Sequence, residues 1–116
     1  KPIATGCHYN EAGEFVNEDA LALQEASSVK RHYRVINPIS FQEPIAPHIA
    51  AKKKGDLLTV NSLVNIINES IQTEAFINII EGVGGWSVPI NEMEYMSDVV
   101  RTLQIPVILV VGIRLG

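Results

Sequence analysis

The chain is poor in cysteine, in positive charge and in long apolar runs. Cys7 is the single cysteine among 116 residues, which excludes an internal disulfide framework, suits a reducing compartment and leads us to expect a cytoplasmic protein. Lys and Arg total 9 against 13 Asp and Glu, so the net charge of −4 argues against nucleic acid or an anionic membrane as a partner. The longest apolar run, residues 105–113, contains Pro106 and Gly112 and is too short to span a bilayer.

The phosphate-binding pattern G-x-x-x-x-G-K-[ST] is also absent from the chain. The composition is that of a folded chain. Hydrophobic residues make up 47% and charged residues 19%, and the length suits one small domain at most. Residues 75–80 and 106–111 have the continuous apolar character of strands buried on both faces. Because helical patterns alternate with them, we predict part of a single α/β domain over residues 1–116, with a parallel sheet and right-handed crossovers.

Capping residues and apolar spacing predict four helices. Thr59 can cap one of them, and Asn17 begins another with two carboxylates in its first turn, where they suit the positive end of the helix dipole. Residues 93–103 form a third pattern, and a short helix from Pro47 is expected to end at Gly55. The apolar stripe of the helix after Thr59 consists of Val60, Leu63, Val64, Ile67 and Ile71.

Ligands of open parallel sheets bind beyond the carboxyl ends of the strands, so the residues after each predicted strand are candidates. Glu81 directly follows residues 75–80, where a carboxylate can hold Mg²⁺ beside phosphate oxygens. Gly82, Gly84 and Gly85 would let backbone N–H groups approach an anion closely. We favour this interpretation as a site for Mg²⁺ and an anion. The alternative, a glycine-rich turn with a solvated Glu81, stays open.

Two further strand ends carry weaker signals. Lys1 and Thr5 could neutralise and hydrogen-bond a phosphate or carbamate, although a surface lysine is the commoner situation. Residues 111–116 precede a position where a helix N-terminus could bind a carboxylate. Asp19 gains interest only if it meets Glu81, because two carboxylates on one Mg²⁺ are common in phosphoryl transfer. These residues indicate an anion-binding site in an α/β fold. Whether the site also uses a metal ion stays open.

Five segments, in this order and spacing, carry a resemblance to the dethiobiotin synthetase family, the ATP-dependent carboxylases of biotin synthesis. The patterns KPxxxG and EGxGG are each weak alone, but the five segments together are specific. They are residues 1–6 (KPIATG), 17–24 (NEDALALQ), 37–50 (NPISFQEPIAPHIA), 81–86 (EGVGGW) and 106–116 (PVILVVGIRLG). The resemblance implies a parallel sheet of the P-loop NTPase type with flanking helices, incomplete in this chain.

The resemblance also implies an activity and its partners. The substrate would be 7,8-diaminononanoate, whose amine is carbamated by CO₂; ATP then phosphorylates the carbamate, and attack by the neighbouring amine closes the ureido ring and releases phosphate. It further implies Mg²⁺ as cofactor, ATP as co-substrate and a homodimer.

Residue roles follow from the resemblance position by position. Lys1 is implied as the catalytic residue that stabilises the carbamate and the transferring phosphoryl group, and Asp19 and Glu81 match Mg²⁺-associated carboxylates at the nucleotide. Further nucleotide contacts are implied for Gly82, Val83 and Gly84. Substrate contacts are implied for Thr5, Gly84, Gly85, Leu115 and Gly116, the last two acting across the dimer.

The chain departs from the family in two respects. Val83 stands where the family usually has alanine, and its branched side chain is expected to crowd the phosphate approach. The resemblance covers only the central part of a family chain, without the N-terminal phosphate-binding loop and the C-terminal segment that holds the nucleotide base, so we expect the 116 residues alone to be inactive. Two alternatives remain: a related amide-forming synthetase domain of the cobyrinate type, and an inactive subunit-pairing module.

Overall fold

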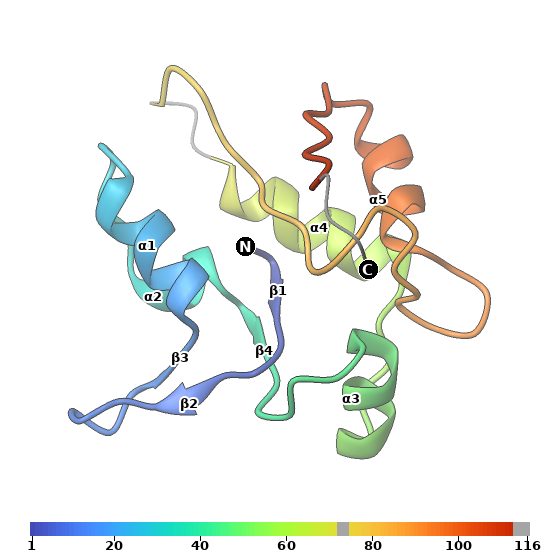
Figure 1. The fold of residues 1–116 in the computed structure, drawn as a ribbon. Coiled ribbons are helices and arrows are strands. Elements are labelled where there is room, and N and C mark those ends of the chain that lie inside the picture. Colours follow the sequence, from blue (N-terminus) through green and yellow to red (C-terminus); the bar gives the residue numbers. More distant parts are fainter. Residues whose placement is uncertain (72–74, 113–116) are drawn as a thin grey trace.

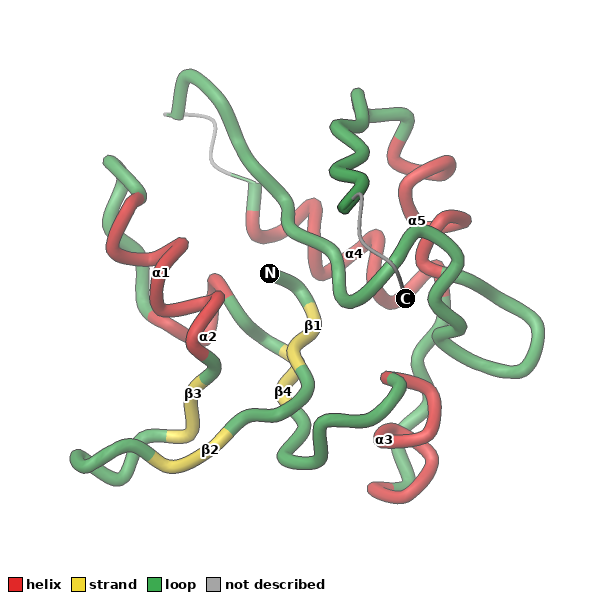
Figure 2. Tube along the Cα trace, viewed as in Figure 1, coloured by secondary structure: helices red, strands yellow, loops and turns green. Residues whose placement is uncertain are grey.

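The computed structural model describes residues 1–71 and 75–112. Strands and helices are short and are joined by long connections (Figures 1 and 2). In chain order they are β1 (Ile3–Ala4), β2 (His8–Tyr9), β3 (Phe15–Val16), α1 (Glu18–Ala26), α2 (Tyr33–Ile36), β4 (Ile39–Ser40), α3 (Pro47–Lys54), α4 (Val60–Ser70) and α5 (Met96–Leu103).

A small parallel sheet lies at the centre of the fold. β1 pairs with β4 in parallel, with Ile3 opposite Ile39. The crossover between them carries an antiparallel hairpin, β2 and β3, followed by α1 and α2. Figure 1 shows α1 and α2 together on one side of the β1–β4 pair and α3 and α5 on the other. The helices thus flank a parallel pair, as an α/β fold requires.

Local capping explains three of the predicted helices. The Asn17 side chain accepts a hydrogen bond from the Ala20 N–H at the start of α1, and the Thr59 hydroxyl accepts one from Ser62 at the start of α4. α3 ends at Gly55, whose φ of 79° lies in the left-handed region that glycine tolerates. The predicted positions of these helices are confirmed.

The fourth predicted helix, residues 93–103, begins three residues later than expected, as α5. The Asn91 side-chain oxygen accepts hydrogen bonds from the N–H groups of Met93 and Glu94 and holds them in a turn. The Asp98 carboxylate then accepts from the Tyr95 N–H, so the helix starts at Met96. Side-chain capping therefore moves the boundary.

The hydrophobic core forms where α4 and α5 pack beside β1. Leu63 and Val99 have no exposed surface, and Ile3 and Ile90 are almost fully buried with them. Val60, Leu63 and Ile67 of the predicted stripe are buried, whereas Ile71 lies beyond the helix end and is exposed. One face of α4 therefore anchors the core, and the stripe ends with the helix.

The prediction of a buried strand at residues 75–80 is wrong for this structure. The segment has no strand assignment, and Phe76, Ile77 and Ile79 are exposed. Residues 77–80 line a cavity of about 350 Å³ together with Lys1 and Pro2. None of the described strands pairs with this segment, so no ladder satisfies its backbone groups as a strand requires.

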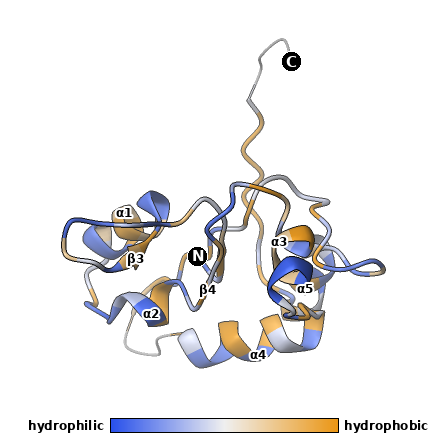
Figure 3. Cartoon of the chain, turned by 90° about the horizontal axis from the view of Figure 1, so that it is seen from below, coloured by the Kyte–Doolittle hydropathy of each residue, from blue (hydrophilic) through white to orange (hydrophobic). Residues whose placement is uncertain are grey.

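The second predicted strand, residues 106–111, is also wrong for this structure. Ile108 is 92% exposed and Val110 is 87% exposed, and the described part of the segment makes no sheet pairing. Figure 3 shows this apolar stretch extending away from the helices. An apolar run becomes a strand only where another strand satisfies its backbone groups. Within residues 1–71 and 75–112, no helix has both the length and the apolar character to cross a membrane.

Candidate active site

Three charged residues that are far apart in the sequence meet just before β1. The Lys1 Nζ donates hydrogen bonds to Asp19 Oδ2 at 2.8 Å and to Glu81 Oε1 at 2.7 Å. The Lys1 side chain is only 7% exposed, whereas both carboxylates reach solvent. The ammonium group is therefore held between two carboxylates, at the inner end of a site that opens outward.

Each member of this cluster is placed by a different element. Lys1 lies before β1 and not, as the sequence predicted, at the end of a strand, and the register of β1 is fixed by pairing with β4. Asp19 lies in the first turn of α1, and Glu81 follows the extended segment 75–80. Asp19 and Glu81 are therefore brought to one place by Lys1, which bridges them, and the condition under which Asp19 gains interest is met through the lysine.

The environment keeps Lys1 protonated. Burial, the largest single influence, lowers the pKa of Lys1, but the hydrogen bonds and charges of Asp19 and Glu81 together raise it above its ordinary value of 10.5. Two carboxylates and one ammonium leave the cluster with a net charge of about −1, so it can still attract a cation.

The donor atoms of the cluster suit Mg²⁺. Mg²⁺ prefers oxygen ligands and usually takes one or two carboxylates, completing its shell with water and substrate phosphates. Asp19 Oδ1 and Glu81 Oε2 make no hydrogen bond to any described residue, so each carboxylate keeps one oxygen for a cation. No third Asp, Glu, His or Cys joins such a group in the part of the chain that the structure describes. Two carboxylates fit this pattern for Mg²⁺.

The glycine-rich loop after Glu81 turns its backbone outward. Gly82, Gly84 and Gly85 are exposed, and Gly84 has a φ of 67°, with a Cβ at that position lying 3.1 Å from a Val88 methyl group. The positive φ of Gly84 therefore favours glycine, and a side chain there would also need the Val88 methyl group to shift slightly.

Val83, by contrast, is buried in the hydrophobic core. Its side chain points inward and does not cover the exposed glycine backbone, so the expectation that it crowds the phosphate approach is wrong. Any contact that Val83 makes with an anion would come from its main chain.

The remaining predicted site residues are Thr5, Leu115 and Gly116. Thr5 is half-buried directly after β1, and its carbonyl accepts a hydrogen bond of 3.4 Å from the Asn17 side chain. This links it to the start of α1, the helix that carries Asp19. Leu115 and Gly116 lie outside the described residues.

Sequence reasoning missed Asn37 and Tyr33. Asn37 is 2% exposed, and its side chain binds the Lys1 carbonyl, while the Tyr33 hydroxyl accepts a hydrogen bond from the backbone N–H of Asn17. No spacing or charge pattern distinguishes them; only the position of Asn37 at the start of the segment 37–50 sets it apart.

The fold and this cluster define an α/β domain with a lysine–carboxylate site beside its parallel strands. The chain belongs to the AAA domain family, whose model matches residues 1–116. Together with the small parallel sheet and its flanking helices, this match confirms the predicted α/β fold of the P-loop NTPase type.

Curated relatives are similar over the whole of this chain. The protein from Xanthomonas axonopodis pv. citri (strain 306) is 43% identical, that from Pseudomonas paraeruginosa 42%, and that from Xylella fastidiosa 43%. All three are named ATP-dependent dethiobiotin synthetase BioD. The chain spans about half of their length, 51%, 50% and 50% in the same order. The resemblance noted from the five motifs is confirmed.

Proposed function

We propose that this chain is part of an ATP-dependent enzyme that converts 7,8-diaminononanoate, CO₂ and ATP into dethiobiotin, ADP and phosphate. One observation carries the proposal: the Lys1 ammonium lies between the carboxylates of Asp19 and Glu81, beside an exposed glycine loop. The whole-chain similarity to proteins named dethiobiotin synthetase supports the choice of substrate.

The reaction needs three balanced steps. One amine of the substrate attacks CO₂ and loses a proton, which gives a carbamate. A carbamate oxygen attacks the γ-phosphorus of ATP, and the bond to the β-phosphate oxygen breaks to release ADP. The second amine attacks the carbonyl carbon, loses a proton and expels phosphate, which closes the ring. The substrate amines are the nucleophiles, so the protein need not activate one of its own side chains.

The main task of the site is to bring two anions together. A carbamate and a triphosphate repel each other, so a fixed positive charge that contacts both in the transition state lowers the barrier. Lys1 suits this role because its pKa is raised above the ordinary value and its side chain is held on both sides. Asp19 and Glu81 thus orient the ammonium.

Asp19 and Glu81 are also the residues that would hold Mg²⁺, which when bound supplies positive charge beside the phosphate oxygens. The outward backbone of Gly82 and Gly84 suits contacts with nucleotide phosphates, because N–H groups without a neighbouring side chain can approach an anion closely. Thr5 and Gly85 are proposed to contact the diamine. A homodimer, with Leu115 and Gly116 reaching the partner's substrate, and a cytoplasmic location are parts of the same proposal.

The test uses the protein expressed from the complete coding sequence. With 7,8-diaminononanoate, ATP, Mg²⁺ and [¹⁴C]bicarbonate, we expect acid-stable radioactive product and one phosphate per product. Lys1→Ala should reduce the rate by at least about 100-fold, the size expected for loss of a group that stabilises transition-state charge.

A matched control is Lys52→Ala, because Lys52 is an exposed lysine that also pairs with a carboxylate, Glu92, at 3.2 Å. It should keep the wild-type rate within about twofold, since exposed ion pairs contribute little. Product from cobyrinate with ATP and glutamine, and none from the diamine, would favour the cobyrinate-type synthetase instead. No ATP-dependent product from either substrate would leave the subunit-pairing role.

A further inference from the structure

Asn37 is a buried polar side chain whose hydrogen-bonding capacity is fully used. Its Nδ2 donates to the carbonyl oxygens of Lys1 at 2.9 Å and of Ile39 at 3.2 Å. Its Oδ1 accepts from the hydroxyls of Tyr33 at 3.1 Å and of Ser40 at 2.8 Å. Two donors and two acceptor sites are all that a carboxamide offers, so the side chain is fixed in one orientation.

Tyr33 extends this connection to the helix that carries Asp19. Its hydroxyl donates to Asn37 and accepts from the backbone N–H of Asn17 at 2.8 Å. Asn17 is the N-cap of α1, where its side chain accepts from Ala20, and Asp19 is two residues further on. Burial, partly offset by the hydrogen bond from Asn17, raises the pKa of Tyr33, so the hydroxyl keeps the proton that it donates.

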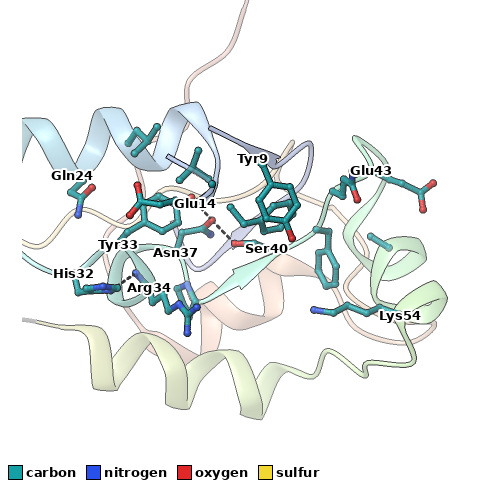
Figure 4. Close-up of a pocket in the computed structure, with 18 of the residues that line it drawn as sticks. Tyr9, Glu14, Gln24, His32, Tyr33, Arg34, Asn37, Ser40, Glu43 and Lys54 are labelled. Carbon is teal, nitrogen blue, oxygen red and sulfur yellow. Dashed lines mark hydrogen bonds between the residues drawn. The ribbon is translucent and has the colours of Figure 1, made fainter. Parts of the chain in front are cut away.

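Figure 4 shows Tyr33, Asn37 and Ser40 grouped together on the wall of a cavity of about 1330 Å³. The connection therefore runs from the main chain of Lys1 through Asn37 and Tyr33 to the start of α1. Among the described residues, no hydrogen bond joins the side chain of Tyr33 or Asn37 to the carboxylates of Asp19 and Glu81 or to the Lys1 ammonium, and every side chain that the connection uses is uncharged.

We propose that Asn37 and Tyr33 are positioning residues for the lysine–carboxylate site. Asn37 fixes the main chain of Lys1, Tyr33 fixes the first turn of α1, and the hydrogen bond between them sets the separation across which the Lys1 ammonium reaches Asp19 at 2.8 Å. Neutral hydrogen bonds suit this task, because they hold both partners without adding charge to a site that must bind anions and a cation. The consequence for catalysis rests on the proposed function.

Tyr33→Phe is the variant of choice, because it removes one hydroxyl and keeps the ring. Asn37→Ala would leave several buried groups without partners and would reduce stability as well. In the protein expressed from the complete coding sequence, Tyr33→Phe should lower kcat about fivefold, the effect of one net hydrogen bond, with KM for the diamine within about twofold. The control is Tyr9→Phe, at an exposed tyrosine of the β2–β3 hairpin, which should keep the wild-type kcat.

A double-mutant cycle separates positioning from a general structural role. If Tyr33 acts through Asp19, adding Tyr33→Phe to Asp19→Ala should change kcat less than about twofold, because the contact to be positioned is already gone. A further fivefold loss in the Asp19→Ala background, or a wild-type kcat for Tyr33→Phe alone, would overturn the proposal.

Hydrogen–deuterium exchange tests the connection without any turnover. Tyr33→Phe should speed exchange in the first turn of α1 several-fold, with exchange in α4 unchanged. Faster exchange in a protein that makes no dethiobiotin would refute the proposed function and support the positioning role. Unchanged exchange in α1 would overturn the positioning role, whether or not the protein is active.

Discussion

Replacing Glu81 by glutamine is the most direct perturbation of the site. Glu81→Gln keeps the side-chain length and an oxygen that can still accept the 2.7 Å hydrogen bond from Lys1, but it removes the negative charge. The net charge of the cluster changes from about −1 to about 0, and one of the two carboxylates available to Mg²⁺ is lost. Geometry is thus largely preserved while charge is not.

The size of the effect follows from the geometry and the exposure. A hydrogen bond to a charged group contributes about 1.5–3 kcal/mol. Because the Glu81 side chain is 43% exposed, solvent screening reduces the expected loss to about 1–2 kcal/mol. At 1.4 kcal/mol for each factor of ten, this predicts a fall in kcat/KM of about 5- to 30-fold.

The assay is phosphate release with 7,8-diaminononanoate across a titration of Mg²⁺. We expect Glu81→Gln to need more Mg²⁺ for half-maximal rate, since it has lost a ligand charge. Glu92→Gln is the matched control, because Glu92 also accepts a hydrogen bond from a lysine, Lys52, at 3.2 Å, but its side chain is 84% exposed. The rate of this variant should stay within about twofold of wild type. A wild-type kcat/KM for Glu81→Gln at ordinary Mg²⁺ concentrations would refute the assigned role.

The remaining predictions concern catalysis, packing and thiol chemistry. Lys1→Ala should cost far more turnover than His48→Ala in the same assay, and equal losses would contradict the catalytic assignment. Leu63→Ala should lower the stability by about 2–5 kcal/mol, seen as a lower urea midpoint at unchanged slope, because Leu63 is fully buried between packed elements. Cys7 should react slowly with Ellman's reagent at pH 8 in the native protein and fast in guanidinium, because burial raises the pKa of its thiol. That raised pKa also predicts that stability falls as the pH rises above about 9, because the thiol then ionises in the unfolded chain before it does in the folded chain. Fast labelling of the native protein would contradict both expectations.

The helices could be predicted from the sequence because their signals are local. Asn17, Thr59 and Gly55 set helix ends through contacts with residues only a few positions away, and these were correctly predicted. Even the error at α5 is local in origin, since Asn91 and Asp98 capture the backbone N–H groups around the expected start.

The strand predictions failed for a different reason. Residues 75–80 and 106–111 have the apolar composition of buried strands, and composition is a property of the sequence. Pairing is not, because a ladder needs a second strand at hydrogen-bonding distance, and within the described residues neither segment has one.

For the site, the sequence alone determined the residue types: a lysine, which it placed at a strand end, an acid in the first turn of a helix, and an acid before a glycine-rich loop. Only the tertiary structure decided that Lys1 bridges Asp19 and Glu81, which lie 18 and 80 positions away from it. Only the tertiary structure revealed Asn37 and Tyr33, since burial and hydrogen-bond partners depend on which distant segments the fold brings together.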